Sequence, residues 1–148
     1  MKEKVLFVCV HNSARSQMAE ALLNHHCPED FFAESGGLEP GELNPLAVEV
    51  MGEIGIDIAG QPTKSVFELF QSGRLYSHVI ALCDAEASER CPIFPGFVQR
   101  HSWSFENPQT SGNSREERIS RMRLVRDQIQ QRILAWCAER CVSAPNNR

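Results

Sequence analysis

Apolar residues along the chain fall into two alternating patterns: short continuous runs, and longer stretches in which they recur every three or four positions. The continuous runs predict buried strands, at Lys4–Val8, Phe31–Glu34, Tyr76–Leu82 and Phe97–Trp103. The helical spacing predicts helices, from about Ser13 to Asn24, from Pro45 to Gly55, from Ser65 to Gly73 and from Ser114 past Trp136. Strands that alternate with helices favour parallel β-α-β units. We therefore expect residues 1–148 to form one α/β domain, with helices on both faces of a parallel sheet.

Three helix starts carry recognisable capping residues. Asn44 is a preferred N-cap, and Pro45 follows it at the first helical position. Ser65–Glu68 and Ser114–Glu117 have the spacing of a capping box. These signals fix where the second, third and last helices are expected to begin.

The segments between these elements are predicted from their polar and glycine content. Gly36 and Gly37 are expected to end the second strand, and residues 38–43 to form a polar, flexible loop. Asp84–Arg90 is polar and helix-capable. Residues 104–113 are expected to form a loop before the last helix.

Composition and charge narrow the classes of function. The 148 residues have a hydrophobic fraction of 42%, enough for a core, and a net charge of -4. Because binding to phosphate backbones needs a basic surface, that charge argues against nucleic acid as the main partner. No apolar run approaches the ~20 residues that span a bilayer, and Val5–Val10 is shorter than the ~7–15 apolar residues of a signal peptide. We expect a cytoplasmic monomer that does not enter a membrane.

The cysteine content indicates free or redox-active thiols. A core-forming chain without a secretion signal rarely uses a disulfide framework, and this chain has cysteines at positions 9, 27, 83, 91, 137 and 141. A structural zinc site is disfavoured because there is no Cys-x2-Cys pair or matching histidine pair. We expect Cys27, with His25 and His26, to be a surface or capping residue at a helix end, and Cys137 and Cys141 to be core or half-buried thiols.

The segment Cys9–Ser16 is the strongest candidate site. Cys9 ends a strand and Arg15 starts a helix, and the small and polar residues between them let the chain curl tightly. In such a curl, successive backbone N–H groups converge on one point, next to the positive end of the helix. This field stabilises a thiolate at Cys9. The segment therefore predicts an oxyanion-binding loop made of Val10, His11, Asn12, Ser13, Ala14, Arg15 and Ser16.

The side chains of this loop suit nucleophilic chemistry. The Arg15 guanidinium can clamp two oxygens of a tetrahedral oxyanion, and the Ser16 hydroxyl can donate a hydrogen bond to the Cys9 sulfur. A thiolate held beneath a bound oxyanion is placed for in-line attack. We therefore assign Cys9 and Arg15 as catalytic residues.

The Cys-x5-Arg-Ser pattern between the first strand and first helix resembles the low-molecular-weight protein tyrosine phosphatases. The stretch from Val5 to Ala21, VLFVCVHNSARSQMAEA, is more similar still to the arsenate reductases built on that fold. The similarity covers nearly the whole chain, through Ser35-Gly36-Gly37, Asn44-Pro45, Cys83, Cys91-Pro92, Trp103 and the final helix. It implies a four-stranded parallel sheet and a loop wrapped around arsenate, with Asn12 supporting the unusual backbone turn of that loop.

Two further cysteines are placed to cooperate with Cys9. Cys83 ends the third predicted strand, so it can approach Cys9 at the same edge of the sheet. Cys91 lies eight residues further on. A helix would separate Cys83 from Cys91 by ~12 Å, whereas a disulfide needs Cα atoms within roughly 7 Å. The two can bond only if Asp84–Arg90 loops or unwinds.

The resemblance to thioredoxin-coupled arsenate reductases implies a use for these thiols. Cys9 would attack arsenic, Cys83 would attack Cys9 and release arsenite, and Cys91 would attack Cys83 to free Cys9. Thioredoxin, with glutaredoxin as the alternative, would then reduce the Cys83–Cys91 disulfide. No cofactor and no metal is needed for this chemistry.

The sequence departs from the related families at two positions. Phosphatases of this fold carry an acidic proton donor after the last strand, where this chain has Asn107, with Glu106 adjacent to it. Many arsenate reductases of this fold bind potassium through residues that match Asn12, Glu20 and Ser35 and through an acidic residue that is Lys64 here. We expect the Lys64 ammonium to pair with Glu20 in place of the ion.

Two alternative functions stay open from the sequence. One is a low-molecular-weight protein tyrosine phosphatase, which Asn107, the Cys83 and Cys91 pair and the lack of an aromatic residue in Leu38–Leu43 all oppose. The other is a noncatalytic oxyanion or redox sensor. Arsenate reduction, in arsenical resistance, is the favoured interpretation.

Overall fold

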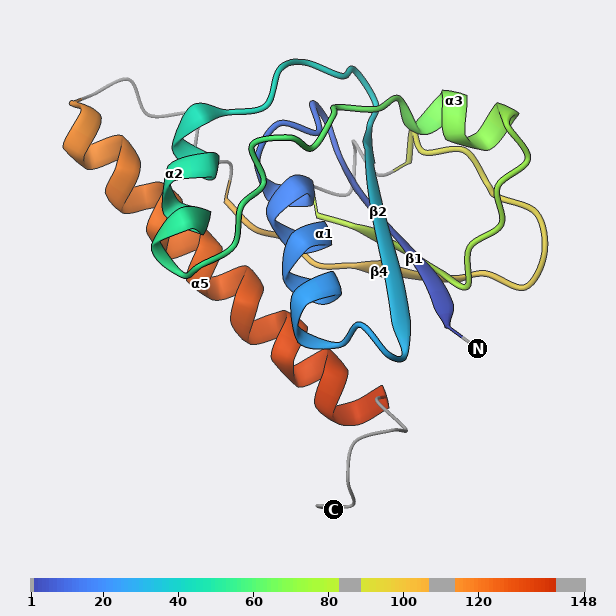
Figure 1. Cartoon of the computed structure of the whole chain (residues 1–148). Helices are drawn as coiled ribbons and strands as arrows, with labels where there is room; N and C mark the ends of the chain where they lie inside the picture. The colour runs from blue at the N-terminus through green and yellow to red at the C-terminus, as the bar shows by residue number, and fades with distance from the viewer. Residues whose placement is uncertain (1, 83–88, 107–113, 141–148) are drawn as a thin grey trace.

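The computed structural model describes residues 2–82, 89–106 and 114–140. Its strands form one parallel sheet in the order β2-β1-β3-β4, as the resemblance implied (Figure 1). The strands are β1 (Glu3–Cys9), β2 (Phe31–Gly37), β3 (His78–Ala81) and β4 (Gln99–Ser102). The helices are α1 (Arg15–His26), α2 (Pro45–Glu53), α3 (Val66–Gln71) and α5 (Arg115–Arg140).

The two faces of the sheet are covered by separate apolar layers. Val5 and Phe7 of β1 point into a layer with α1, α2 and α5, and Leu6 and Val8 point into a layer with α3 and the segment 91–98. This alternation follows from the period-two geometry of a strand. Helices therefore lie on both faces of the sheet, as expected (Figure 1).

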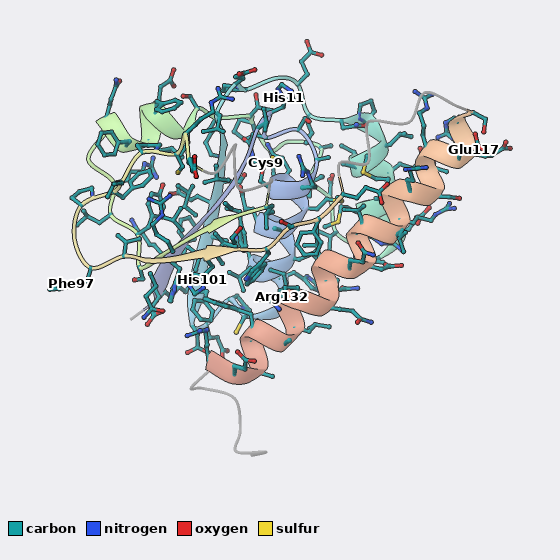
Figure 2. All side chains as sticks on the ribbon, turned by 180° about the vertical axis from the view of Figure 1, so that it is seen from behind. Cys9, His11, Phe97, His101, Glu117 and Arg132 are labelled. Carbon is teal, nitrogen blue, oxygen red and sulfur yellow. The ribbon has the colours of Figure 1, made fainter. Side chains whose placement is uncertain are left out.

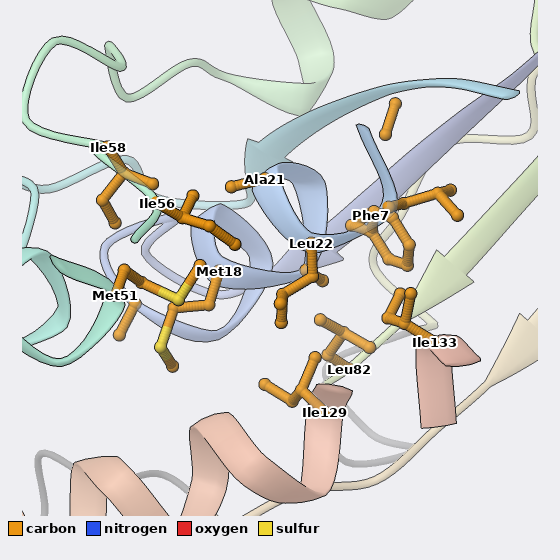
Figure 3. Packing of buried hydrophobic residues seen from close by; sticks show 14 of the residues in the cluster. Phe7, Met18, Ala21, Leu22, Met51, Ile56, Ile58, Leu82, Ile129 and Ile133 are labelled. Atoms are coloured by element: carbon orange, nitrogen blue, oxygen red, sulfur yellow. The ribbon is translucent and has the colours of Figure 1, made fainter. Parts of the chain in front are cut away.

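The largest helix, α5, is held by the apolar stripe that the sequence predicted. Its side chains at Ile119, Met122, Val125, Ile129, Ile133 and Trp136 are all buried. Figure 3 shows Ile129 and Ile133 of α5 facing Leu22 of α1 and Phe7 of β1, which packs the helix layer against the sheet. No helix within the described ranges is long and apolar enough to cross a bilayer.

The capping predictions are confirmed at all three helix starts. Asn44 Oδ1 accepts a hydrogen bond from the Leu46 N–H at 2.8 Å, and Ser65 Oγ accepts from the N–H groups of Phe67 and Glu68. Ser114 and Glu117 form a reciprocal capping box, with both side chain-to-backbone distances at 3.2 Å. These bonds satisfy N–H groups that a helix start leaves without partners.

Several predicted limits are wrong. The third and fourth strands are shorter than expected, at four residues each. The side chain of Phe97 is fully exposed and lies before β4 begins. β4 is an edge strand whose residues are mostly exposed, so apolar content does not mark its ends.

The ends of β2 and α1 refine two local predictions. Gly36 and Gly37 are the last two residues of β2, so the strand runs through them instead of stopping at Glu34, and Gly37 pairs with Cys9. Cys27 is the C-cap of α1, with its N–H donating to Leu23 O at 2.9 Å, and its side chain is buried; Cys137 is buried as expected. Cys141 and most of the helix-capable segment, residues 83–88, lie outside the described residues.

Candidate active site

The candidate loop connects the carboxyl end of β1 to the first turn of α1. Cys9 is the last residue of β1 and Arg15 the first of α1, and both side chains are buried. The loop lies at the carboxyl edge of the parallel sheet, where α/β proteins bind ligands. In Figure 2, the labels of Cys9 and His11 mark this edge of the sheet.

The carbonyl groups of the loop point outward and are bound by other segments. Five consecutive carbonyls each accept a hydrogen bond at 2.7–3.2 Å. Their donors, in order from Cys9 to Ser13, are the N–H groups of Leu38, Glu39 and Gly41, the Gln17 side-chain amide and the N–H of Asn44.

Because the carbonyls are anchored outward, the inside of the loop is lined by N–H groups. Peptide C=O and N–H groups point in opposite directions, so carbonyls turned outward leave N–H groups turned inward. Within the described part of the chain, the N–H groups of His11, Asn12 and Ala14 have no protein acceptor. A concave array of N–H groups at a helix start is suited to bind an anion, so the loop has a suitable geometry, and oxyanion binding by it stays a prediction.

The nucleophile candidate has a directed hydrogen bond. Cys9 Sγ lies 2.9 Å from Ser16 Oγ, and Asn12 Nδ2 donates to the same Ser16 oxygen at 2.7 Å. Because the amide fills an acceptor position of Ser16, the serine hydroxyl can donate its proton to the sulfur. The contact has the geometry that the sequence predicted for Ser16, and its role in catalysis stays a prediction.

Asn12 supports the turn of the loop. It has a φ of 56°, the sole positive value at a non-glycine residue in the described ranges, and asparagine tolerates this region better than most residues. Its Oδ1 accepts from the Lys64 N–H at 2.8 Å and from Gln17 Nε2 at 3.2 Å. The side-chain role expected for Asn12 is therefore present.

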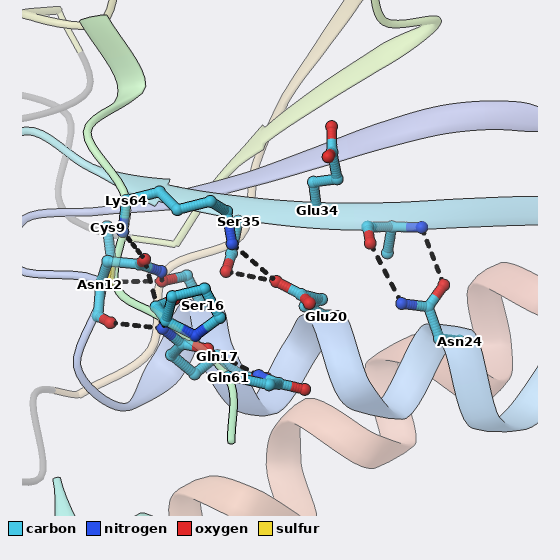
Figure 4. A network of polar contacts seen from close by, with 12 residues as sticks. Cys9, Asn12, Ser16, Gln17, Glu20, Asn24, Glu34, Ser35, Gln61 and Lys64 are labelled. Atoms are coloured by element: carbon cyan, nitrogen blue, oxygen red, sulfur yellow. Dashed lines mark hydrogen bonds and ion pairs between the residues drawn. The ribbon is translucent and has the colours of Figure 1, made fainter. Parts of the chain in front are cut away.

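Two glutamines extend this support, and the sequence did not single them out. Gln17 is fully buried, and its Nε2 lies within hydrogen-bonding distance of Asn12 O and Pro62 O, both at 3.0 Å. Gln61 Nε2 donates to Gln17 Oε1 at 2.6 Å (Figure 4). The sequence signal that could have indicated the supporting role of Gln17 is its position on an apolar helix face next to the Cys-x5-Arg motif.

Gly37 allows another segment to approach the loop closely. A Cβ atom at Gly37 would lie 2.9 Å from the backbone of Val10, His11 and Asn12. The N–H groups of Leu38, Glu39 and Gly41 then donate to the loop carbonyls, so the segment expected to be flexible is a hydrogen-bonded wall of the site. Only glycine fits at this crossing.

The guanidinium of Arg15 is fixed by two backbone carbonyls. Its Nη1 donates to Leu82 O at 3.2 Å and to Phe105 O at 3.0 Å. Among the described residues these are its only acceptors, so its other N–H groups can serve a ligand in the cradle. Arg15 also ties the loop to the segments that follow β3 and β4.

The other predicted residues are only partly placed. Cys91 is buried in the apolar layer that also contains Leu38. Cys83 and Asn107 lie outside the described residues. Glu106 forms an ion pair with Arg121 of α5 at 2.6 Å, so its carboxylate is held by that helix.

The region matched to a potassium site contains an ammonium group. Lys64 Nζ lies 3.8 Å from Glu20 Oε1, and Ser35 Oγ donates to the same oxygen at 2.6 Å (Figure 4). Burial raises the pKa of Glu20, and the bonds from Ser35 and Lys64 offset only part of that effect. Since the cation is supplied by the chain, these residues do not fit a potassium ion.

The chain matches one protein family and is similar to arsenate reductases. The model of the family described as low molecular weight phosphotyrosine protein phosphatase matches residues 4–141. An arsenate reductase of Shouchella clausii is 37% identical over 133 residues, which are 89% of this chain and 93% of that protein.

Solved structures of arsenate reductases have a similar fold. A structure described as an arsenate reductase in the phosphate binding state has a TM-score of 0.72 and 32% identity, covering 94% of this chain and 98% of the other. A Corynebacterium glutamicum thioredoxin-dependent arsenate reductase has a TM-score of 0.61 and 28% identity, covering 90% of this chain and 63% of the other.

Proposed function

Because this chain belongs to the low-molecular-weight phosphotyrosine protein phosphatase family and its relatives include arsenate reductases, we propose that it reduces arsenate to arsenite through a relay of Cys9, Cys83 and Cys91. The protein is an arsenate-reducing enzyme. The relay supplies the two electrons that the reaction needs, and a thioredoxin restores the thiols.

The first step takes place in the oxyanion loop. The Cys9 thiolate attacks arsenic, a sulfur–arsenic bond forms, and one arsenate oxygen leaves as water after protonation. The inward N–H groups of the loop and the free N–H groups of Arg15 hold the remaining oxygens. Ser16 Oγ lies 2.9 Å from the sulfur and can donate a hydrogen bond to it during the attack.

The next steps move the oxidation from arsenic to sulfur. The Cys83 thiolate attacks Cys9 sulfur, the electron pair of the sulfur–arsenic bond passes to arsenic, and arsenite leaves. Cys91 then attacks Cys83, so a Cys83–Cys91 disulfide forms and Cys9 returns as a thiolate. Two thiols and arsenate thus yield one disulfide, arsenite and water.

One observation carries this proposal: five outward carbonyls and the Ser16 donor surround Cys9 at the carboxyl edge of the sheet. A buried structural cysteine would need neither the inward N–H groups nor a hydroxyl aimed at its sulfur. A thiolate that attacks a bound oxyanion needs both.

Arsenate-dependent NADPH oxidation tests the proposal directly. The protein is incubated with thioredoxin, thioredoxin reductase and NADPH, and a parallel reaction contains glutaredoxin, glutathione and glutathione reductase. We expect turnover with thioredoxin, and Cys9→Ser should abolish it while leaving the folding transition unchanged. Multiple turnovers by Cys9→Ser would contradict the assignment of the nucleophile.

The setting of the reaction belongs to the same proposal. A relay that ends in a disulfide needs a reducing compartment to restore its thiols, so we place the enzyme in the cytoplasm, acting as a monomer. Arsenate and thioredoxin are then its partners, with glutaredoxin as the alternative reductant. Neither a nucleic acid nor a membrane takes part.

The phosphatase alternative is less well supported. Glu106, the acidic residue next to Asn107, is engaged by Arg121, so it is not available as the proton donor that ester cleavage needs. The sensor alternative would show one round of thiol oxidation per protein, with no further NADPH consumption. The NADPH assay distinguishes the reductase from the sensor, and cleavage of an aryl phosphate, measured beside it, identifies a phosphatase.

A further inference from the structure

The segment that carries Cys91 is connected to the oxyanion loop through one ion pair. Arg90 Nη2 donates to Glu39 Oε2 at 2.8 Å. Arg90 immediately precedes Cys91, and Glu39 lies next to the carbonyl-binding wall of the loop. The ion pair therefore links Arg90, which precedes Cys91, to the segment that binds the loop after Cys9.

Glu39 is itself fixed on the loop from two sides. Its N–H donates to Val10 O at 2.7 Å, and its carbonyl oxygen lies 2.9 Å from His11 Nδ1. The Arg90 guanidinium holds the pKa of Glu39 below its usual value, so the carboxylate is charged at neutral pH. The acidic end of the pair is thus a fixed, charged point on the oxyanion loop.

Cys91 is in a position where it cannot react without moving. Its side chain is 6% exposed and belongs to the apolar layer that contains Leu38, the residue before Glu39. Thiols buried in apolar surroundings are inert. A thiol that must attack a disulfide and then be reduced by another protein has to leave this layer, and the Arg90 contact has to open as it does.

We propose that Glu39 and Arg90 are positioning residues that hold Cys91 buried next to the oxyanion loop and set how readily it is released. The inference rests on the proposed relay. The two side chains are 58% and 49% exposed, so the pair is of the weak, salt-sensitive kind. That suits a contact that must break in every turnover.

The strength of such a pair sets the size of the effect. Exposed ion pairs shift an equilibrium by about 2–5-fold. Loss of the pair should therefore raise the fraction of time that Cys91 is accessible by about that factor. When the pair is removed through Arg90→Gln, the attack of Cys9 on arsenate should stay unchanged, because Arg90 lies outside both the oxyanion loop and the segment that binds its carbonyls.

The test is the alkylation rate of Cys91 in the reduced protein, followed with N-ethylmaleimide and peptide mapping. Cys27 and Cys137 are buried elsewhere in the fold and serve as internal references. Glu39→Gln should raise the Cys91 rate about 2–5-fold relative to both at low salt, and the difference should shrink at high salt. Glu42→Gln removes the same charge from the same exposed loop and should have no effect.

Restoring the pair with reversed charges separates the ion pair from a general loosening. The double variant Glu39→Arg/Arg90→Glu should return the Cys91 rate toward that of the wild type. An unchanged Cys91 rate in Glu39→Gln, or a raised rate that the double variant does not lower, would overturn the proposal.

A single-turnover experiment connects the pair to the relay. After one equivalent of arsenate, Arg90→Gln should convert the Cys9–Cys83 disulfide into Cys83–Cys91 faster than the wild type, while arsenite appears at the same rate. Equal rates of conversion would count against the role of the pair. If no variant formed an arsenate-dependent disulfide, the proposed function would fail, whereas the alkylation result would still decide the positioning role.

Discussion

At the scale of single residues, Gly37 shows how much of the site depends on one missing side chain. Alanine at this position would place Cβ 2.9 Å from three backbone atoms of the oxyanion loop, and backbone cannot move aside as a flexible side chain can. We expect Gly37→Ala to lower kcat/KM for arsenate about 10–100-fold, since small displacements of reacting groups have effects of this size.

The control for this prediction is Gly60→Ala. A Cβ at Gly60 would meet nothing within 4 Å, so its kinetics should match those of the wild type. Urea unfolding of both variants shows whether the activity loss of Gly37→Ala exceeds its effect on stability. Wild-type kinetics in Gly37→Ala would mean that the loop tolerates displacement.

Asn107 is the position at which we expect one residue to separate arsenate reduction from phosphate-ester cleavage. Cleavage of a phosphate ester expels a poor leaving group, and general acid catalysis there contributes ~10²–10⁴-fold. In arsenate reduction the leaving group is a hydroxyl that solvent can protonate. We expect the wild type to cleave aryl phosphates poorly, and Asn107→Asp to raise that activity while changing arsenate reduction little.

Rates measured with aryl phosphates of increasing leaving-group pKa test this prediction. The gain from Asn107→Asp should be largest for the poorest leaving group, because the proton matters most there. Asn107→Ser, which also lacks a carboxyl, should show no gain. Equal rates for the wild type and Asn107→Asp would mean that this loop does not deliver the proton.

At the scale of elements, Lys64 connects the loop before α3 to α1 and β2. Its ammonium lies near Glu20 of α1, which Ser35 of β2 also binds. Because this internal cation offsets part of the burial effect on Glu20, arsenate reduction by the wild type should not depend on potassium. Lys64→Asp should make it potassium-dependent, since two carboxylates would then share the site.

Initial rates with potassium chloride, compared with tetramethylammonium chloride at equal ionic strength, provide the measurement. The bulky ion cannot enter a site of this size, so it serves as the matched control. A strong activation of the wild type by potassium would show that Lys64 does not fill the cation position.

β3, β4 and α5 meet at a histidine pair far from the active site. His78 Nδ1 lies 3.2 Å from His101 Nε2, and both rings pack edge-on against Trp136. Burial lowers the pKa of His101, and the nearby His78, Arg140 and Arg132 lower it further. The folded state therefore binds a proton at His101 less readily than the unfolded chain.

This shift has a definite consequence for stability. Above pH 6.5, the ordinary histidine pKa, neither state is protonated at this residue. As the pH falls below that value the unfolded state takes up the proton first, so the free energy of unfolding decreases. Urea titrations at pH 7.5 and 5.5 should show that the free energy of unfolding decreases less in His101→Gln than in the wild type. An equal decrease would exclude His101 as the source.

At the scale of the whole molecule, the relay predicts different blocks for its two later thiols. In Cys83→Ser, arsenic should stay on Cys9 after one equivalent of arsenate, unless an external thiol resolves it. In Cys91→Ser, a Cys9–Cys83 disulfide should accumulate instead. Both variants should lose thioredoxin-linked turnover.

Peptide mapping by mass spectrometry distinguishes these two species. Cys137→Ser serves as the control, because this residue lies on the buried face of α5 and has no part in the proposed relay. Full steady-state turnover by either Cys83→Ser or Cys91→Ser would rule out the three-thiol sequence.

The sequence predicted the features that depend on local pattern. The apolar spacing of α5, the caps at Asn44, Ser65 and Ser114, and the Cys-x5-Arg loop are all readable from neighbouring residues. The ends of β3 and β4 were missed because these strands are short and β4 is exposed. At an exposed sheet edge, apolar residues such as Phe97 do not indicate which residues pair with the neighbouring strand.

The supporting residues of the site were harder to predict for a different reason. Gln17, Gln61 and Gly37 act through contacts between segments that lie far apart in the sequence. No local periodicity distinguishes a glutamine that holds a loop from one at the surface. Such residues become visible only when the fold brings the segments together.

The outward anchoring of the loop carbonyls has a consequence for selectivity. A cradle whose shape is set by its own outer hydrogen bonds cannot widen or contract to tell two tetrahedral oxyanions of similar size apart. Phosphate should therefore occupy the loop readily and act as a competitive inhibitor. The enzyme would then distinguish the two ions by reactivity, because arsenic(V) accepts an electron pair from sulfur far more readily than phosphorus(V), and its performance in a cell would depend on the ratio of arsenate to phosphate.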